Sequence, residues 1–535
     1  MNILLKKIAY IICLFAAFFS SSCNDIYDEV TSLKTDRLFS PVNFNIALNK
    51  TQVTFTWAAA DSAVSYTLQV SKDSLNYSTP VLDTTITKLS YVQEFAGATQ
   101  FYARIRSNSS NNTKASTFNN KLSFKTPAEN LFSSYSTIMT GMNQVTANWT
   151  PGANVNHLVL TASDKTMQTV QLTANDIAAG SKTITSLSNS TYKVQIYNSD
   201  IVRGEVPIVV EGDVYLPAGG NLLAAITAAS PGQVIILEPG ALYLMGSATY
   251  KLSKDIKIRG LLPTNLPILA MTGSASTTMS MLGFVDSSVI NSVAFENIDF
   301  SGYCDNNSAA VKIGYLFNNN VLTTVSSLYF KNCKLRNFGN TPMRLQGNKN
   351  QVIDILSFNN CTIYDIGFAS TYAIVNTNSN DHVNNINFNN CTVYNFKGPI
   401  VLQTGAYTIG SVNVTNCVFN QTTQDAGNRF EFDLNGLTVT NGIKIKDSVF
   451  GSSGISTSGI RTSGTKTITG CYYTSDYKDE FLVGTTPPTS YTFKDKMTSY
   501  SGASTDLWNA PTTGDFTLKD SAFKGKGVAG DLRWY

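Results

Sequence analysis

One short motif recurs through the later half of the chain and limits what the sequence can fold into. An Asn-Cys pair ends a run of alternating apolar residues at Asn332-Cys333, Asn360-Cys361, Asn390-Cys391 and Asn416-Cys417. The four cysteines are 28, 30 and 26 residues apart, so segments of variable length separate a constant unit. Degenerate copies lie at Asn297-Ile298, Asp447-Ser448 and Gly470-Cys471. Repetition at such a period indicates a stack of equivalent structural units.

The apolar alternation changes phase at each Asn-Cys pair. Leu328 and Phe330 share one face of a strand before the pair, and Cys333 and Leu335 share one face of a strand after it. Both faces can point inward only if the chain turns at Asn332, and asparagine tolerates the left-handed conformation that such a corner needs. Successive coils would then stack the asparagines as a ladder and the cysteines as an apolar column, with rungs about 4.8 Å apart. The sequence therefore predicts a right-handed parallel β-helix.

The cysteines allow two other interpretations. An even set of cysteines can form a disulfide framework, and cysteines can also hold a metal. One cysteine per coil at the same inward site fits a small buried hydrophobe better, and the chain has no CxxC spacing. We expect reduced thiols in the core.

Residues 1–22 have the pattern of a targeting signal. Lys6 and Lys7 precede an apolar stretch from Ile8 to Phe19, and small residues then lead to Cys23. An apolar run this short does not span a bilayer as a helix, which needs about 20 residues. A plain secretory signal is one interpretation, but small residues directly before a cysteine resemble a bacterial lipobox. The resemblance implies cleavage before Cys23, acylation of its thiol and anchoring in outer-membrane lipid.

Residues 23–38 form an acidic linker after the lipidated cysteine. Asn24, Asp25, Asp28 and Glu29 follow Cys23 directly. An acidic stretch at this place resembles the surface-export signal of lipoproteins in Gram-negative glycan-uptake systems. The resemblance implies a protein that faces the cell exterior.

Composition disfavours several classes of protein. The chain has 39 basic and 36 acidic residues, a formal charge of +3, and no basic block. Nucleic-acid binding needs clustered Lys and Arg, so no nucleic-acid partner is expected. The two histidines are His157 and His382, which disfavours a His-rich metal site and a Ser-His-Asp hydrolase.

Short strands separated by polar turns come before the repeat. Residues 39–127 contain apolar segments at 53–57, 65–70 and 101–106, a spacing typical of an all-β sandwich. This segment resembles a fibronectin type III module, with Trp57 at the place of the buried strand-B tryptophan and Phe101 in place of the usual corner tyrosine. Residues 128–210 repeat the pattern with Trp149. We expect two β-sandwiches that act as spacers, with both tryptophans in the cores rather than on ligand platforms.

Residues 211–481 are predicted to form the β-helix. A short helix capped by Asn221 and ending before Pro231 would lead into strands at 234–237 and 256–260. This segment resembles the start of pectate-lyase-like β-helices, in which the helix covers the open N-terminal end. The resemblance implies the fold alone, since this fold hosts lyases, hydrolases, epimerases and inactive binders. Residues 482–535 are expected to cover the C-terminal end.

A second strand should follow each Asn-Cys corner, in segments 310–314, 342–347, 372–377, 399–404, 429–434 and 459–462. Alternation places apolar residues inward, among them Val311 and Ile313 in the first segment and Ile400 and Leu402 in the fourth. The outward residues form a polar stripe: Lys312, Arg344, Gln346, Asn376, Gln403, Glu431, Asp433 and Arg461. Amides and cations along a sheet face suit the many hydrogen bonds of a polysaccharide, although a solvated face without a ligand has the same composition.

Resemblance to polysaccharide lyases implies β-elimination of a uronate. Such enzymes use a cation, often Ca²⁺ held by several carboxylates, and an Arg or Lys as base. Lys312 and Arg344 are the candidate catalytic residues, and Glu431 and Asp433 are weak candidates for a Ca²⁺ site. The carboxylates would lie three coils beyond Arg344, about 14 Å away at the spacing of strands. Two carboxylates are few for Ca²⁺, and an ion pair with Arg461 explains them more simply.

The sequence favours a lipid-anchored protein of the outer membrane, facing outward, that binds a pectin-like or other plant polysaccharide for uptake. Outer-membrane glycan transporter proteins would be its partners, and no cofactor is expected. The second hypothesis is a polysaccharide lyase, for which Ca²⁺ would be the cofactor. The third is an adhesin or structural surface protein.

Overall fold

The computed structural model describes residues 37–110, 114–119, 121–134, 136–273, 276–368, 372–424, 429–454, 457–478 and 494–535. The chain divides into two compact units. The first unit comprises Met1–Ser136, Asn148–Lys182 and Lys193–Pro207, and the second comprises Thr137–Ala147, Thr183–Tyr192 and Ile208–Tyr535. The predicted signal peptide and Cys23 lie outside the described residues.

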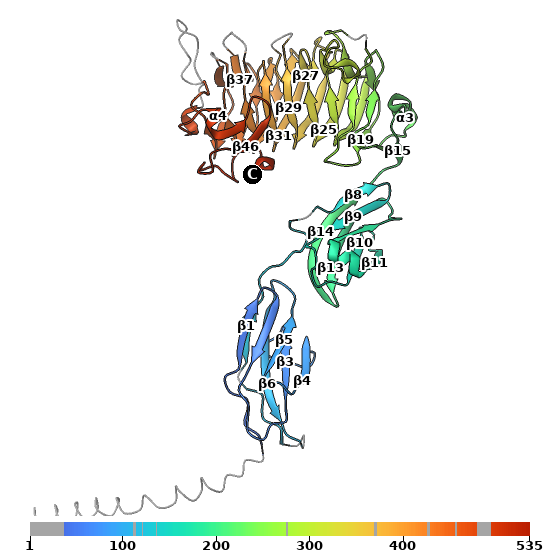
Figure 1. Ribbon diagram of the computed structural model, residues 1–535. Helices are drawn as coiled ribbons and strands as arrows, with labels where there is room; N and C mark the ends of the chain where they lie inside the picture. The colour runs from blue at the N-terminus through green and yellow to red at the C-terminus, as the bar shows by residue number, and fades with distance from the viewer. Residues whose placement is uncertain are drawn as a thin grey trace, which may run out of the picture. The chain divides into compact units, whose positions relative to one another are not determined.

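Seven antiparallel strands form the first sandwich (Figure 1). One sheet has the order β1-β2-β5 and the other the order β4-β3-β6-β7. The strands are β1 (Asn45–Asn49), β2 (Gln52–Thr56), β3 (Ser65–Ser71), β4 (Leu82–Ile86), β5 (Ser90–Glu94), β6 (Gln100–Asn108) and β7 (Leu122–Lys125). Trp57 is 5% exposed, and its ring lies 5.5 Å from that of Tyr66. Trp57 is a core residue, as expected.

Two further antiparallel sheets repeat this strand order, and the boundary between the units runs through them. The order β12-β9-β8 matches β5-β2-β1, and the order β11-β10-β13-β14 matches β4-β3-β6-β7. The strands are β8 (Ile138–Gly141), β9 (Gln144–Asn148), β10 (His157–Ala162), β11 (Met167–Gln171), β12 (Ser181–Ile184), β13 (Ser190–Asn198) and β14 (Ile201–Val210). Helix α2 (Ala174–Ala179) begins after Thr173, whose side chain accepts a hydrogen bond from the amide of Asp176. Trp149 is fully buried.

Three parallel sheets make up the β-helix. Each coil between its two ends contributes one strand to each sheet, and in the described residues sheets 1 and 2 have ten strands and sheet 3 has eight. Sheet 1 contains β15 (Val214–Leu216), β16 (Val234–Leu237), β19 (Ile256–Gly260), β22 (Ser288–Glu296), β25 (Thr323–Lys331), β28 (Val352–Asn359), β31 (His382–Asn389), β35 (Ser411–Thr415), β39 (Ile443–Lys446) and β42 (Lys466–Thr469). Sheet 2 contains β17 (Leu242–Leu244), β20 (Ile268–Ala270), β23 (Asp299–Ser301), β26 (Lys334–Arg336), β29 (Thr362–Ile366), β32 (Thr392–Phe396), β36 (Val418–Asn420), β40 (Val449–Phe450), β43 (Tyr472–Tyr473) and β44 (Thr498–Ser499). Sheet 3 contains β18 (Tyr250–Leu252), β21 (Ser280–Phe284), β24 (Tyr315–Asn319), β27 (Thr341–Leu345), β30 (Val375–Asn378), β33 (Val401–Thr404), β37 (Arg429–Asp433) and β41 (Thr457–Arg461). The predicted fold class, two sandwiches followed by a parallel β-helix, is confirmed.

The interior of the β-helix is a set of side-chain columns. Phe295, Phe330, Phe358 and Phe388 occupy the same place in successive strands of sheet 1. Their ring centroids are 5.4, 5.2 and 5.0 Å apart and the rings are stacked. These distances are close to the spacing of neighbouring strands in a sheet. The hydrogen-bonded register and the packing of the rings therefore have the same repeat.

The corner between sheets 1 and 2 has the predicted conformation in each coil that carries the motif. The φ angles of Asn297, Asn332, Asn360, Asn390 and Asn416 are 55°, 51°, 53°, 52° and 50°. The side chain of Asn332 donates to Asn297 at 2.9 Å, and that of Asn390 donates to Asn360 at 2.8 Å. Asn416 instead donates to the carbonyl of Val528, so the ladder gives way to the C-terminal segment at that coil.

The cysteines of the described residues are free and buried, as expected. Four of them, Cys333, Cys361, Cys391 and Cys417, form a column beside the asparagine corner. The thiols of Cys361 and Cys391 contact the carbonyls of Phe330 and Phe358 at 3.5 and 3.3 Å. Burial raises the pKa of both thiols well above the usual range. The column is therefore neutral and behaves as apolar packing.

Helix α3 (Leu222–Ala228) precedes the first full coil. The side chain of Asn221 accepts a hydrogen bond from the amide of Ala224 at 3.0 Å, which caps the helix as predicted. Leu222 and Ile226 pack into the core of the β-helix. The helix thus covers apolar side chains that no preceding coil could cover.

The expectation that residues 482–535 cover the C-terminal end lies partly outside the described residues; of the described part, Met497 joins the core of the β-helix and the rest packs mainly along its side. In the described residues after 493, only β44 extends a sheet, by pairing with β43. The hairpin of β45 (Trp508–Ala510) and β46 (Asp515–Leu518) and the residues after it pack on the outer face of sheet 2. The physical reason is that Tyr394, Val418 and Val449 point outward on that sheet and are buried only by the cluster that Trp508 and Phe516 complete.

Candidate functional site

The outer face of sheet 3 carries most of the predicted polar stripe, and its register is explicit. Successive parallel pairs align one outward row: Asn318, Arg344, Asn376, Leu402, Asp433 and Arg461. Gln346 follows the end of β27 and donates to the side chain of Asn318 at 2.9 Å. Asp433 lies three coils from Arg344, as the sequence predicts, which is about 14 Å at the spacing of strands.

The position predicted for Lys312 is wrong. Residues 310–314 do not form the strand of their coil, and Asn318 of β24 is the partner of Arg344 instead. Val311, which was expected to point inward, is 52% exposed. The strand of this coil is β24, a few residues later, because its large apolar residue Phe317 is buried in the core. Phe317 pairs in register with Met343 of the following coil. Lys312 lies in the turn before β24, in an isolated bridge with Tyr303.

The orientation predicted for Gln403 is also wrong. Val401 and Gln403 align with Val375 and Thr377, so Leu402 takes the outward place. The residues before Gln403 are all apolar, so alternation does not show which of them face the core. A shift of one residue turns every side chain of a strand to the other face. Gln403 is fully buried, and its amide accepts from the nitrogen of Val383 at 2.7 Å and donates to its oxygen at 3.0 Å. The buried amide is satisfied by a strand of sheet 1.

The two carboxylates of the stripe are bound within the protein. Glu431 is fully buried, and its oxygens accept from the hydroxyls of Thr422 at 3.1 Å and Thr423 at 2.8 Å. Asp433 forms two hydrogen bonds with the guanidinium of Arg461, at 2.8 and 2.5 Å. The predicted ion pair of Arg461 is thus made with Asp433.

These carboxylates do not fit a Ca²⁺ site. Ca²⁺ takes six to eight oxygen ligands, whereas Asp433 is neutralised by an arginine and Glu431 is covered by two threonines. Within the described ranges, no group of three or more His, Cys, Asp or Glu side chains could hold a metal.

Arg344 lies between two tyrosines. It donates to the hydroxyl of Tyr315 at 3.1 Å, and its guanidinium lies 4.2 Å from the ring centre of Tyr372. The Nε atom of Arg344 is buried and has no hydrogen-bond partner within the protein. Burial raises the pKa of Tyr315, so its hydroxyl keeps its proton and can donate in turn. Arg344 is thus a cation held by two rings, with one buried donor atom that the protein leaves unpaired.

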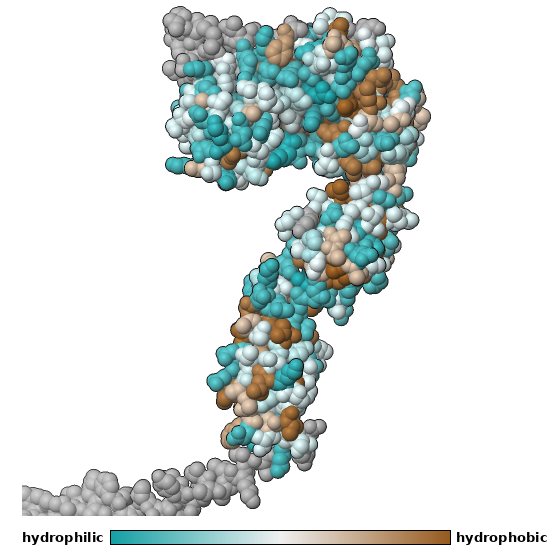
Figure 2. All heavy atoms as spheres, viewed as in Figure 1, coloured by the Kyte–Doolittle hydropathy of each residue, from teal (hydrophilic) through white to brown (hydrophobic). Residues whose placement is uncertain are grey.

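A second group of rings and cations lies in the turns that lead into sheet 3. The ammonium of Lys312 lies 5.0 Å from the ring centre of Tyr303 and 5.5 Å from that of Phe368. Lys397 lies 5.9 Å from the same Phe368 ring. Phe368 is 46% exposed. The face of the β-helix seen in Figure 2 is mostly hydrophilic or neutral, with hydrophobic side chains gathered toward its N-terminal coils. We call these two groups together the aromatic-cation cluster: Tyr303, Lys312, Tyr315, Arg344, Phe368, Tyr372 and Lys397.

The cations of the cluster pack against rings instead of carboxylates. In the described part of the chain, Lys312, Arg344 and Lys397 form no ion pair with a carboxylate, whereas Arg203, Arg259, Arg336 and Arg461 all do. A cation over an aromatic face gains about 0.5–2 kcal/mol without an anion. The rings therefore stabilise three cations that no carboxylate of the described residues neutralises.

Sequence reasoning missed the aromatic members of this cluster. Tyr303, Phe368 and Tyr372 lie in turns, where strand alternation gives no information on direction. No local signal in the sequence marks these turns, since residues 271–279 form a longer turn before sheet 3 than residues 367–374 do.

No family model and no curated protein matches the chain. The FN1–FN3 domains of chicken CNTN1 are similar at 13% identity, over 32% of this chain and 67% of that chain, with a TM-score of 0.15. A two-domain fibronectin type III segment from chicken tenascin is similar at 12% identity, over 32% of this chain and 97% of that chain, with a TM-score of 0.16. The sandwich fold itself rests on the strand order given above.

Proposed function

We propose that the protein binds a polysaccharide along the outer face of sheet 3, with the aromatic-cation cluster as the centre of the site. The observation that carries the proposal is the set of three cations without carboxylate partners among four aromatic rings. Sugars present apolar ring faces and many hydroxyls, so they pair with exposed rings and with spare donors. Phe368 supplies an exposed ring and Arg344 a half-buried cation.

The neighbouring amides extend the site along the β-helix. The side-chain amide of Gln346 donates to that of Asn318 at 2.9 Å. Each of these amides has a further donor or acceptor that a ligand could use. Plant glycans of the pectin type carry both hydroxyls and carboxylates, which match these amides and the free cations. The binding of such a chain for uptake is the role that we propose.

The proposal also includes the location of the protein in the outer membrane. Acylation of Cys23 would anchor the protein in the outer membrane facing outward, and glycan transporter proteins of that membrane would receive the bound chain. Among the described residues, none of the helices has the length and apolar character of a membrane span. Replacing Cys23 with Ala should release the protein from the membrane fraction and abolish its labelling with palmitate.

Elimination chemistry has less support than binding. A uronate lyase of the Ca²⁺-dependent kind needs carboxylates beside its base, but Glu431 and Asp433 are committed to Thr422, Thr423 and Arg461. Arg344 is itself held by Tyr315 and Tyr372. No observation on the structure favours catalysis over binding, and none specifically favours an adhesin.

The test is retention of the full-length protein in gels containing plant glycans, compared with gels without them. We expect retention by a pectin-type glycan, weakened by the combined change Lys312→Ala, Arg344→Ala and Gln346→Ala. Each contact should contribute about 0.5–1.5 kcal/mol, so the triple variant should lose about tenfold or more in affinity. Lys444→Ala, a change of an exposed lysine on sheet 1, is the matched control and should bind normally.

Two outcomes would contradict the proposal. Absence of retention on any plant or host glycan would favour the adhesin or structural role. Growth of ultraviolet absorbance on polygalacturonate, from the conjugated double bond that elimination creates, would show a lyase if it disappeared in the Arg344→Ala variant.

A further inference from the structure

One turn of the β-helix brings together two lysines from other coils. Residues 367–374 lead into β30, and Phe368 of this turn has a partly exposed ring. The ammonium of Lys312, from the turn before β24, lies 5.5 Å from the centre of that ring, and the ammonium of Lys397, from the turn before β33, lies 5.9 Å from it. Because both distances end at one point, the two ammonium groups are at most their sum, 11.4 Å, apart.

The protein leaves the charge of both lysines unpaired. Each ammonium has three N–H donors, yet in the part of the chain that the structure describes neither donates a hydrogen bond or joins an ion pair. Asp365, at the end of β29, accepts from the side chain of Asn395 instead. Two like charges this close repel each other, and a bound anion would remove the repulsion.

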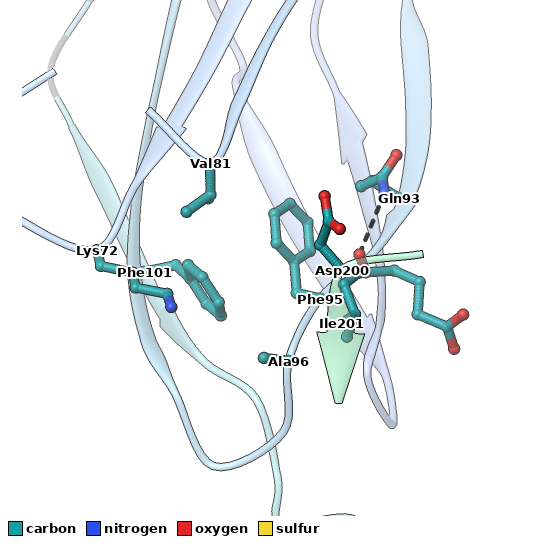
Figure 3. A pocket seen from close by; sticks show the side chains of 9 residues that line it. Lys72, Val81, Gln93, Phe95, Ala96, Phe101, Asp200 and Ile201 are labelled. Atoms are coloured by element: carbon teal, nitrogen blue, oxygen red, sulfur yellow. Dashed lines mark hydrogen bonds between the residues drawn. The ribbon is translucent and has the colours of Figure 1, made fainter. Parts of the chain in front are cut away.

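A lysine without a partner is not in itself a site, as Lys72 of the first sandwich illustrates. Lys72 is exposed and lines a cavity together with Phe95 and Phe101 (Figure 3). These two rings are almost fully buried and contact each other at 5.0 Å, so water solvates the lysine beside them. Lys312 and Lys397 are half-buried instead, and one ring holds both.

We propose that Lys312 and Lys397 together bind an anionic substituent of the polysaccharide, a carboxylate or a sulfate ester. The inference rests on the proposed function and adds that the site selects an acidic chain over a neutral one. Phe368 is the positioning residue that holds the two ammonium groups near each other. Their four-carbon stems are flexible, so both can approach one anionic group and donate charge-assisted hydrogen bonds to it.

The test compares two polymers that differ only in charge. Polygalacturonate carries a carboxylate on every sugar, and its carboxyl-reduced form has a hydroxymethyl group at the same place. We measure the affinity of the full-length protein for each by electrophoresis in gels that contain the polymer. The acidic polymer should bind about tenfold more tightly, the effect of one or two charge-assisted hydrogen bonds. A second pair, dextran sulfate and dextran, shows whether a sulfate ester is bound as well.

The double variant Lys312→Gln with Lys397→Gln tests the lysines themselves. Its affinity for polygalacturonate should fall about tenfold, while its affinity for the carboxyl-reduced polymer should stay the same. Binding of the acidic polymer by the unchanged protein should weaken as salt is added, because salt screens charges, and the double variant should show a shallower dependence. Lys72→Gln with Lys88→Gln removes the same charge from two exposed lysines of the first sandwich and should bind normally.

The outcomes separate this inference from the proposed function. If the protein bound each acidic polymer no more tightly than its neutral counterpart, the inference would be overturned and the proposed function would stand. Equal losses in the two double variants would also overturn it, because net charge rather than the lysine pair would then govern binding. Absence of binding to every acidic and neutral glycan would overturn both. Selective binding of dextran sulfate, lost in the Lys312 and Lys397 variant, would support the inference and assign a sulfate ester as the anionic group.

Discussion

Two kinds of turn in the β-helix differ in how strictly they repeat. The corner between sheets 1 and 2 is a single left-handed residue, with φ close to 50° from Asn297 to Asn416. The turns between sheets 2 and 3 have variable length, with 13 residues between β23 and β24, 4 between β26 and β27, and 8 between β29 and β30. A constant corner keeps the coils in register, whereas a variable turn leaves the stack intact and can carry other residues.

The constant corners contain residues that stabilise the fold, whereas the variable turns contain residues of the candidate site. Tyr303 and Lys312 lie in the 13-residue turn, and Phe368 and Tyr372 lie in the 8-residue turn. Lys312 reaches past the coil between these turns to the ring of Phe368, 5.5 Å away. Binding residues commonly lie on loops positioned by a rigid scaffold, and this β-helix carries these side chains on two turns before sheet 3, of 13 and 8 residues.

The largest effect is expected inside the coils. Phe358→Ala removes a ring from the middle of a stack with neighbours at 5.2 and 5.0 Å. The lost contacts and the cavity should lower the free energy of unfolding by about 3–5 kcal/mol. Urea unfolding, followed by far-ultraviolet circular dichroism, measures the change.

The matched control lies on the same strand. Ile355 of β28 is 39% exposed, so Ile355→Ala should cost about 1 kcal/mol or less. Similar costs for both changes would mean that the interior column does not dominate stability.

The corner could be predicted from the sequence because two signals agree there. The phase of the apolar alternation changes at Asn332, and asparagine favours the conformation that the corner needs. Either signal alone would leave the turn uncertain. Together they predict that the corner lies at Asn332, that Cys333 points inward and that the coils stack.

Sheet 3 could be predicted only in part, and the misses have a physical cause. Ile400 and Val401 are both apolar and both fully buried, so alternation does not indicate which of them faces the core. The orientation of Gln403 then depends on a contact with Val383 of sheet 1, which no local pattern contains. Likewise, the approach of Tyr372 to Arg344 joins two coils and is invisible in either segment alone.

The second largest effect is expected at the corner itself. Asn390 has a φ of 52°, donates to Asn360 at 2.8 Å and accepts from the amide of Leu532 at 2.7 Å. Asn390→Ala should cost about 2–4 kcal/mol, from the left-handed backbone and the lost hydrogen bonds. Asn390→Gly keeps the backbone conformation and should recover about 1–2 kcal/mol of that loss. Equal costs for the two variants would show that the backbone strain is unimportant.

Because the thiols are buried, we expect the free energy of unfolding to depend on pH. Burial raises the pKa of Cys361, Cys391 and Cys417 well above the usual range, while an unfolded thiol ionises near pH 8.5, at about its reference value. Above that pH the unfolded state binds fewer protons than the folded state, so the free energy of unfolding falls as pH rises. The slope is at most about 1.4 kcal/mol per pH unit for each thiol.

Unfolding at pH 7.5 and pH 9.5 measures this dependence, with Cys391→Ala as the control. The variant should show a shallower loss between the two values, because one ionisable group is removed. Rapid reaction of the folded protein with a thiol reagent at pH 9.5 would contradict the burial of the column.

The smallest change in stability is expected at the aromatic-cation cluster. Phe368 is nearly half exposed and lies in a turn outside the strands of its coil, so Phe368→Ala should change the free energy of unfolding by about 0.5 kcal/mol or less. The same change removes the ring that both Lys312 and Lys397 contact, at 5.5 and 5.9 Å. Glycan retention should therefore weaken several-fold while the unfolding midpoint stays constant. Phe368→Tyr keeps a ring and should restore retention. If Phe368→Ala lowered stability as much as Phe358→Ala, the ring would be part of the framework, and the distinction between the constant corner and the variable turns would fail.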